Sequence, residues 1–385
     1  MDVKERYKTR DLPIVRAGFL RVALTLLWLA PLMVSSYAME PDSLSAVKPH
    51  RGWFAKMIDS FSEVDTTYVE PQHYNWSLMI QGAYDFEFYH LRTSNEDLRQ
   101  SVSFSPEPIL KVGPYFGWRW IFLGYNLNLR SLRFGGGKFL SELDGSIYSS
   151  RFGIDLYYRR TSDDYKIRDV NLEEGVSTEL LRGQPFNGMS VRITGLNLYY
   201  IFNHRRFSYP SAFAQSGCQK ISCGSWMAGI GYLNNSIDFD YRKLEQQIAA
   251  SYPDQAVQLD SGLMFNKVKY FDLDLNGGYA YNWVFARDWL FTASLSVALA
   301  YKGASGKTDE ADQGGFNFKN FNIDGVGRFA LVWNNIRWYA GANAIVRTYN
   351  YHNSRFATNN ILGNVYVFLG YNFGLRKEYK KRRKR

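Results

Sequence analysis

The chain has 385 residues, enough for one large domain, and aromatic residues make up 17% of it although the mean hydropathy is −0.32. The formal net charge is +10, but residues 1–21 supply +3 and residues 376–385 supply +7, so the residues between them are neutral. This distribution excludes a nucleic-acid-binding face, and an aromatic-rich yet polar chain is typical of strands with one apolar and one polar face.

Residues 1–38 have the pattern of a secretory signal peptide. Basic residues precede the apolar stretch 22–34, and Ser36, Tyr37 and Ala38 follow it as a small-x-small cleavage site. The apolar stretch is shorter than the roughly 20 residues of a spanning helix, although an uncleaved anchor is the alternative. We expect 39–76 to be a periplasmic or luminal segment with a short amphipathic stretch at 53–61. No later stretch is apolar enough for a spanning helix, so membrane embedding requires strands.

From residue 77 to residue 375, apolar and polar residues alternate with a period of two. The alternation predicts strands at 77–90, 109–118, 121–129, 148–159, 190–204, 225–238, 271–282, 289–301, 321–333, 336–349 and 365–373. Most are longer than the roughly 5–6 residues usual in soluble proteins and match the roughly 9–11 residues of a membrane-spanning strand. The sequence therefore predicts an all-β fold, a transmembrane antiparallel up-and-down β-barrel.

Tryptophans bracket three very short connections, which lie near Arg119, at 285–288 and at Asn334-Asn335. The six residues are Trp118, Trp120, Trp283, Trp289, Trp333 and Trp338. Short turns mark the periplasmic rim of such barrels, and tryptophan prefers the membrane–water boundary. We interpret the six as an aromatic girdle on one rim rather than as core residues of a soluble sandwich.

A counting argument sets the number of strands. If the three turns share a rim, an even number of strands separates them, yet five predicted strands lie between the turns near Arg119 and at 285–288. The hidden strand is either Phe207–Gln215 or a second strand within 138–159, divided near Ser149-Ser150. Either choice gives about twelve strands.

Long connections at 91–108, 239–267, 302–316 and 350–364 then become extracellular loops. The stretch 160–188 is periplasmic if Phe207–Gln215 is the hidden strand. It is extracellular if 138–159 divides.

Charged residues of both signs fall on the predicted inner faces. They are Asp85, Glu87, Arg151, Asp155, Arg159, Asp272, Asp274, Asp324, Arg328, Arg337 and Arg347. These lumen-lining candidates could form a charged constriction that selects a solute, or a set of ion pairs that fills a narrow interior. Barrels of about eight strands are filled and those of sixteen or more are open. We favour the ion pairs.

Cys218 and Cys223 are the only cysteines, and glycines flank them. In an exported protein they are a candidate disulfide, with two free thiols as the alternative. A metal site would need further ligands, and the nearest histidine is His204. We expect no metal and no cofactor.

Two histidines, His90 and His352, lie near the predicted outer rim, but neither has a spacing that requires catalysis. We expect a non-enzymatic barrel, either a narrow pore or a structural envelope protein. The alternatives are a membrane-embedded hydrolase acting on lipid or peptide at the outer rim, and a surface adhesin or binding scaffold. The basic tail, 376–385, would lie in the periplasm, where it either contacts anionic headgroups or a partner, or stays solvated.

Three blocks carry a resemblance to a known family: 64–69 (VDTTYV), 149–160 (SSRFGIDLYYRR) and 206–222 (RFSYPSAFAQSGCQKIS). Over roughly 60–375 the chain resembles the Bacteroidota domain-of-unknown-function family numbered 4421. The resemblance implies a β-barrel embedded in the outer-membrane lipid of a Gram-negative bacterium. It implies no assigned activity and supplies no catalytic residues.

Overall fold

The computed structural model describes residues 64–94, 100–118, 121–124, 127–128, 142–162, 165–172, 178–253, 259–304, 321–352, 356–377 and 379–380. They all belong to one compact unit, Phe54–Arg385. The expected signal peptide at 1–38, the amphipathic stretch at 53–61 and Trp120 lie outside the described residues.

The described elements are almost all strands. Before the midpoint they are β1 (Val69–Pro71), β2 (Tyr74–Thr93), β3 (Ser101–Pro106), β4 (Ile109–Trp118), β5 (Ile121–Gly124), β6 (Leu127–Asn128), β7 (Glu142–Tyr148), β8 (Phe152–Ser162), β9 (Tyr165–Asn171), the 3-10 helix η1 (Glu179–Leu181), β10 (Pro185–Phe186) and β11 (Met189–Ile201). They continue with α4 (Tyr209–Phe213), β12 (Gly217–Gln219), β13 (Cys223–Phe239), α5 (Tyr241–Ser251), β14 (Lys267–Ala286), β15 (Trp289–Ala304), β16 (Phe321–Asn334), β17 (Trp338–His352) and β18 (Phe356–Leu375).

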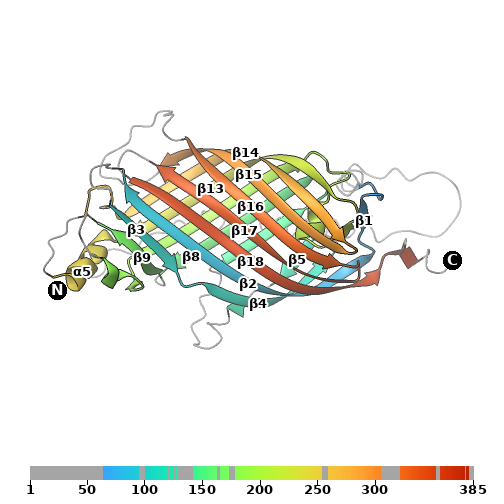
Figure 1. Ribbon diagram of the computed structural model, residues 1–385, viewed down its shortest axis with the longest axis horizontal. Coiled ribbons are helices and arrows are strands. Elements are labelled where there is room, and N and C mark those ends of the chain that lie inside the picture. The colour runs from blue at the N-terminus through green and yellow to red at the C-terminus, as the bar shows by residue number, and fades with distance from the viewer. Residues whose placement is uncertain are drawn as a thin grey trace, which may run out of the picture. The chain divides into compact units, whose positions relative to one another are not determined.

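The long strands form an antiparallel β-barrel (Figure 1), and the described strands group into twelve chain passes. Pairing runs in the order β7, β8, β11, β13, β14, β15, β16, β17, β18, β2, and β2 then pairs with both β3 and β4. β3 and β4 are two parts of one pass, and so are β5 and β6, which both pair with β4. β9 and β10 extend the sheet beside β3 without a pass of their own. The predicted barrel and its number of strands are confirmed.

The hidden strand lies within 138–159, where β7 and β8 form a hairpin around Ser149 and Ser150. The other candidate, Phe207–Gln215, is wrong, because this stretch contains the helix α4. Ser208 caps the helix by accepting the Ser211 N–H at 3.2 Å, and Pro210 sits in the first turn, where its missing N–H costs nothing.

One expected loop is largely strand, and a second is partly strand. β17 and β18 leave only 353–355 between them, so the loop expected at 350–364 is wrong, and β3 occupies part of 91–108. Asn360 and Asn364 resemble loop residues in the sequence, yet both are buried on the inward face of β18. Polar residues on an inward face are ordinary in a barrel.

The two ends of the barrel differ. We call the end with the connections after β4, β7, β11, β14 and β16 the turn rim, and the end with α5 the loop rim (Figure 1). The turns near Arg119, at 285–288 and at 334–335 all lie on the turn rim, as the counting argument requires. The described residues of the stretch 160–188 lie on the loop rim, as the divided 138–159 requires.

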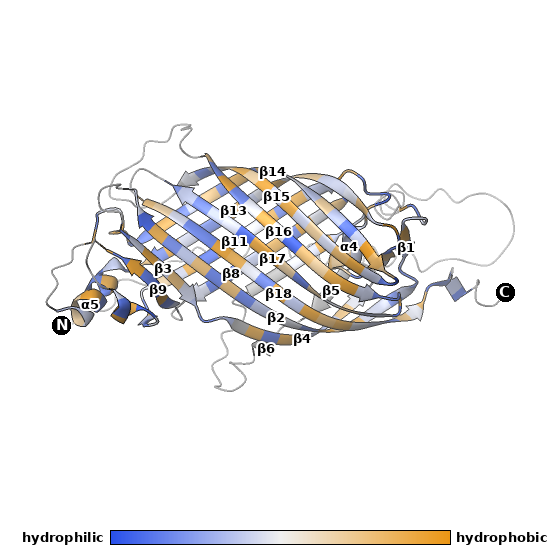
Figure 2. Ribbon diagram, viewed as in Figure 1, coloured by the Kyte–Doolittle hydropathy of each residue, from blue (hydrophilic) through white to orange (hydrophobic). Residues whose placement is uncertain are grey.

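Hydrophobic and hydrophilic residues alternate along the strands (Figure 2), and the side chains of the outward face are apolar. Exposed apolar side chains there include Leu78, Ile80, Leu196, Ile230, Leu275, Leu295, Leu299, Ile323, Leu331, Val367 and Leu369. On β14 the outward side chains from Leu273 to Trp283 are apolar or aromatic, apart from Gly277. This stretch is roughly 33 Å long, and a strand tilt of about 40° reduces it to about 25 Å, the height of a membrane-embedded apolar band.

Candidate functional site

Arg328 and Asp155 form an ion pair that connects nearly opposite walls of the barrel. Arg328 on β16 approaches Asp155 on β8 with an N–O distance of 2.6 Å, and each side chain is 3% exposed. The carboxylate also accepts hydrogen bonds from the Ser146 hydroxyl at 2.9 Å and the Tyr148 hydroxyl at 3.2 Å. The Arg328 guanidinium lies 5.4 Å from the centre of the Tyr199 ring. These contacts hold the arginine rigidly across the lumen.

A lysine lies between two carboxylates on its neighbouring strands. The ammonium of Lys302 on β15 is 3.1 Å from Asp272 on β14 and 2.8 Å from Asp324 on β16. Lys302 also donates to the carbonyl of Asn350, and its side chain has no exposed surface. The three partners satisfy the three donors of an ammonium group.

A third cluster connects β8 with β2 and β4. Arg159 pairs with Glu87 at 3.1 Å and with Asp85 at 3.6 Å, and Lys111 pairs with Asp85 at 2.5 Å. Asn364 donates to Asp85, and Tyr89 donates to Glu87 at 2.8 Å. Charges from separate walls therefore neutralise one another inside the barrel.

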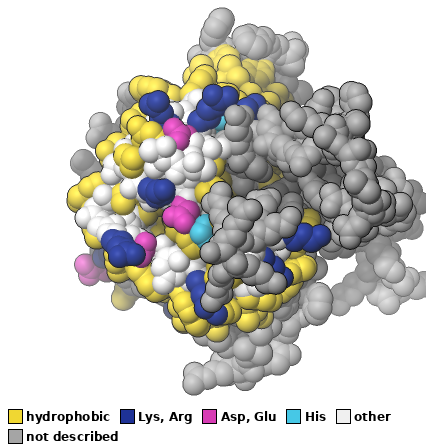
Figure 3. Space-filling view, turned by 90° about the vertical axis from the view of Figure 1, so that its right-hand side faces the viewer, with side chains coloured by type: hydrophobic (Ala, Val, Ile, Leu, Met, Phe, Trp, Pro, Cys, Tyr) yellow, Lys and Arg dark blue, Asp and Glu magenta, His cyan; other side chains and the backbone are white. Residues whose placement is uncertain are grey.

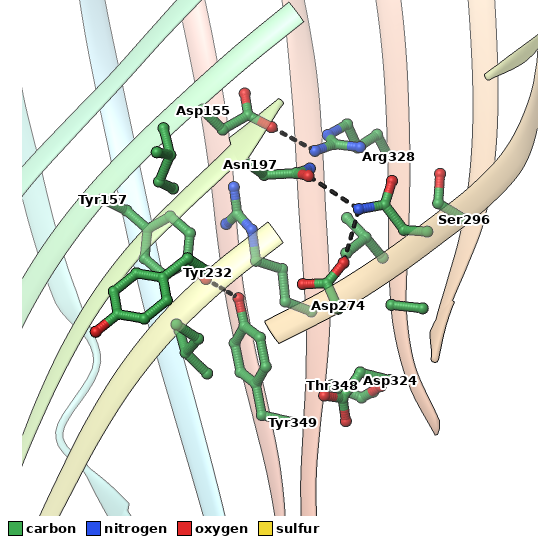
Figure 4. Close-up of a pocket in the computed structure, with 16 residues that line it drawn as sticks. Asp155, Tyr157, Asn197, Tyr232, Asp274, Ser296, Asp324, Arg328, Thr348 and Tyr349 are labelled. Atoms are coloured by element: carbon green, nitrogen blue, oxygen red, sulfur yellow. Dashed lines mark hydrogen bonds and ion pairs between the residues drawn. The ribbon is translucent and has the colours of Figure 1, made fainter. Parts of the chain in front are cut away.

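A small cavity of about 40 Å³ lies among these groups (Figure 4). Its polar lining includes Asp155, Asn197, Asp274, Asn276, Asp324, Arg328, Arg347 and Tyr349. Asn276 donates to Asp274 at 2.7 Å and to Asn197 at 3.0 Å, so the lining is itself hydrogen-bonded. Each water needs about 10–15 Å³ of such volume, so the cavity has room for only a few water molecules.

Glycines on the inner face let tyrosine rings lie flat against neighbouring strands. A Cβ at Gly195 would come within 2.0 Å of the Tyr157 ring, and one at Gly153 within 2.1 Å of the Tyr199 ring. Tyr157 and Tyr349 reach each other across the lumen, with their hydroxyls 2.5 Å apart. These rings occupy space between the charged clusters.

An apolar core fills the lumen at the loop rim. Its buried members include Tyr89, Leu91, Phe104, Ile167, Phe186, Val191, Ile237, Phe239, Leu244, Ile248, Leu263, Phe265, Tyr270, Tyr351 and Phe356. They come from strands on different sides of the barrel and from α5. Phe265 stacks on Phe356 with ring centres 4.8 Å apart, and Tyr270 stacks on Tyr351 at 4.9 Å.

Residues 202–222, which we call the lumen plug, fold into the barrel from the turn rim. Helix α4 contacts β7, β15 and β16. Tyr209 in this helix is fully buried, packs against Tyr148 with ring centres 5.7 Å apart, and has its hydroxyl 3.3 Å from that of Ser294. Viewed from this end, hydrophobic side chains lie around much of the periphery, and charged side chains are scattered over the end face and its edge (Figure 3).

The side chain of Gln219 forms hydrogen bonds with several parts of the lumen plug. Its side-chain oxygen accepts the Ser208 N–H at 2.8 Å and the Asn282 amide at 3.0 Å. Its side-chain nitrogen donates to the carbonyls of Arg206 at 2.7 Å and Ile221 at 3.0 Å. One buried side chain therefore connects the plug to itself and to β14.

The two cysteines are free thiols in the structure, which differs from the candidate disulfide. Cys218 donates to the Asn334 carbonyl at 3.1 Å, whereas Cys223 donates to the Arg206 carbonyl at 3.2 Å. Burial raises the pKa of the Cys218 thiol to about 12. At neutral pH this thiol is protonated and poorly nucleophilic.

Most lumen-lining candidates lie where the alternation places them, with two exceptions. Arg337 is exposed in the turn after β16, where it donates to the Tyr371 hydroxyl at 2.7 Å. The backbone turn ends the strand alternation before this residue, so its predicted inward position is wrong. Arg151 also lies in a turn, just before β8.

Sequence reasoning missed the two lysines of the ion-pair clusters, Lys111 and Lys302. Lys302 was assigned to a loop, but it continues the inward alternation of Ser294, Ala298 and Ala300 along β15. Its even residue number, shared with these inward residues, could have identified Lys302 as facing the lumen.

Five of the six girdle candidates lie in the described residues, all beside turn-rim connections. Trp289 pairs in register with Trp333, and Trp338 lies 4.6 Å from the Tyr371 ring. Trp76 was missed; its ring is 5.3 Å from that of Phe116 and 6.5 Å from that of Trp118.

The histidines do not form a hydrolytic site with described residues. His90 Nδ1 lies 2.9 Å from the Ser103 hydroxyl, but Ser103 is only 4% exposed and therefore inaccessible to a substrate. His352 ends β17 on the loop rim. Within the described ranges, no three His, Cys, Asp or Glu side chains gather as metal ligands. None of the described helices is long and apolar enough to cross a membrane.

Comparisons with known proteins add a family and several distant structures. The family model described as a domain of unknown function, DUF4421, matches residues 63–373. No curated protein matches the sequence significantly.

Among solved structures, the outer membrane protease OmpT from Escherichia coli is 8% identical with a TM-score of 0.36, covering 80% of this chain and all of its own. The translocator domain of the autotransporter NalP from Neisseria meningitidis is 10% identical with a TM-score of 0.31, over 78% of this chain and 88% of its own. The Pseudomonas putida toluene transporter TodX is 8% identical with a TM-score of 0.22, over 77% of this chain and 90% of its own. None of these likenesses carries an argument about activity.

The exterior of the barrel determines where it resides. An apolar band about 25 Å high, with aromatic side chains at the turn rim and charges inside, is the arrangement of outer-membrane barrels. A surface this apolar is stable only against lipid. The protein is an integral outer-membrane β-barrel.

Proposed function

The chain belongs to the family described as domain of unknown function DUF4421, and from this premise we propose that it is a non-conducting, structural barrel of the outer membrane. The loop rim faces outward and the turn rim faces the periplasm, since short turns and a tryptophan girdle are typical of the periplasmic rim.

The observation that carries this proposal is the filled lumen. The loop-rim core, the cross-wall pairs such as Arg328 with Asp155, and the lumen plug occupy successive levels of the interior. A hydrated solute would have to displace apolar side chains at one level, buried ion pairs at the next and the plug at the third. Breaking one such pair costs about 3–5 kcal/mol, so the structure favours an envelope scaffold over a narrow pore.

Planar-bilayer recording tests the proposal. Purified protein, shown to be folded by its heat-modifiable mobility on gels, is expected to insert without producing discrete conductance steps. A known porin inserted under the same conditions supplies the positive control. Reproducible steps from the folded protein would show an open path and refute the non-conducting barrel.

A further inference from the structure

Three basic side chains lie in one row across the outer wall near the loop rim. Arg160 on β8 is the register partner of Arg192 on β11, which is opposite Ser236 on β13, which is opposite Lys269 on β14. Arg160, Arg192 and Lys269 are exposed. They face outward, because the residues next to them in the chain alternate toward the lumen. We call these three residues the basic row.

Within the part of the chain that the structure describes, no acidic side chain pairs with the basic row. Among the described residues, Arg160, Arg192 and Lys269 form no ion pair, whereas Lys267, closer to the rim, pairs with Asp238 at 2.5 Å. Adjacent strands are about 4.8 Å apart, so the row from β8 to β14 spans about 14 Å. Among the described residues, the basic row is therefore a broad strip of positive charge without an acidic partner.

The basic row lies just beyond the apolar band. Leu156, Leu196, Tyr232 and Leu273 form another outward row in the same register, and each lies four residues along its strand from the level of the basic row. Four residues are about 13 Å along a strand, or about 10 Å in height at the usual tilt. Register partners lie perpendicular to the tilted strands, so the row is inclined and its two ends differ by about 9 Å in height. A lipid whose chains cover the apolar side chain of one strand has its headgroup beside the basic residue of the same strand.

We propose that the basic row binds the phosphates of a diphosphorylated glycolipid of the outer leaflet. One phosphate is too small to contact both Arg160 and Lys269, whereas two phosphates joined by sugars can span the strip. Arginine forks recognise phosphate oxygens in pairs. The inference rests on the proposed outward orientation of the loop rim.

A binding measurement on the full-length protein in detergent micelles tests the assignment. Native mass spectrometry counts bound diphosphoryl lipid A, monophosphoryl lipid A and phosphatidylglycerol, with inorganic phosphate as a competitor. The row variant carries Arg160→Gln, Arg192→Gln and Lys269→Gln. The control variant carries Arg182→Gln, Arg242→Gln and Arg287→Gln, three exposed arginines outside the row.

The parent and the control variant are expected to bind diphosphoryl lipid A more tightly than the other two lipids. The row variant is expected to lose roughly fivefold affinity for each basic residue, or about a hundredfold in all. Equal affinity of the parent and the row variant for diphosphoryl lipid A would refute the site. Equal losses of affinity in the row variant and the control variant would show that only the net charge of the protein matters, and would refute it as well. Phosphatidylglycerol binding as tightly, or displacement by equimolar phosphate, would overturn the diphosphorylated ligand. Heat-modifiable mobility confirms that each variant is folded, and conductance, recorded separately, tests the non-conducting barrel independently.

Discussion

A lysine without exposed surface can stay charged in a barrel only if carboxylates surround it. Lys302 meets this condition between Asp272 and Asp324. Burial makes an isolated charge costly, and two carboxylates without the lysine would repel each other in the same low-dielectric space. The lysine and the two aspartates therefore depend on one another.

Replacing this lysine tests the dependence. Lys302→Met is expected to lower the free energy of unfolding by about 3–5 kcal/mol, because it leaves two buried carboxylates without a counterion. Urea unfolding in detergent micelles, followed by tryptophan fluorescence, measures the change. Lys243→Met on the exposed face of α5 is the control and is expected to change stability by no more than about 0.5 kcal/mol. A Lys302 variant as stable as the control would contradict the account.

At the residue scale, alternation predicted which side chains face inward but not which ones pair. Asp155 and Arg328 are far apart in the sequence, and only closure of the barrel brings them within 2.6 Å. Lys302 was missed because the alternation was ended one residue too early. Arg337 was misplaced because the alternation was continued through a turn.

At the element scale, the lumen plug is a short segment held by side-chain hydrogen bonds rather than by length. A five-residue helix is too short to be stable alone, so α4 depends on its surroundings. Gln219 supplies several of its connections, including those to Ser208 and Asn282. Without that side chain, buried donors and acceptors of the plug are left unpaired.

The variant Gln219→Ala is expected to lower stability by about 1–3 kcal/mol and to speed tryptic cleavage after Arg206 and Lys220. Limited proteolysis of the folded protein in micelles, read by mass spectrometry, measures the cleavage rates. Gln247→Ala, on α5 at the opposite rim, removes a side-chain amide without touching the plug and should leave those rates unchanged. Equal rates of tryptic cleavage after Arg206 and Lys220 in the two variants would show that Gln219 does not hold the plug.

The sequence predicted the elements unevenly. Long alternating strands such as β14 and β15 were found because each buries one face and exposes the other. The sequence offers the stretch that contains α4 as one of two candidates for the hidden strand, although Ser208 followed by a proline in the first turn is a recognisable helix start. β18 was predicted too short because its inward asparagines resemble loop residues.

At the scale of the whole molecule, the apolar band predicts how strongly a charged substitution on the outward face destabilises the barrel, depending on its height along the barrel axis. Leu295 on β15 is outward-facing and 65% exposed near the middle of the band, whereas Leu180 in η1 is 62% exposed at the loop rim. Leu295→Arg is expected to destabilise the lipid-embedded barrel by about 2–4 kcal/mol, and Leu180→Arg by about 0–1 kcal/mol. Urea unfolding from lipid vesicles measures both. Equal costs for the two substitutions would contradict the placement of the band.

The architecture as a whole was the most predictable property, since strand length, turn chemistry and parity all indicated a twelve-stranded barrel. From the sequence we could only favour a filled interior over an open one. The reason is that different parts of the chain close the two ends. The loop-rim core gathers residues from many strands, and the plug comes from a single connection. Neither closure follows from local alternation.

The pairing of β18 with β2 determines when the barrel can be completed. Its register runs from Phe356 opposite Thr93 to Leu375 opposite Tyr74, so the last strand supplies the partner of the first. Contacts this distant in the sequence form slowly. Assembly therefore ends at the seam, and the exported chain must be kept from misfolding until its final strand has arrived.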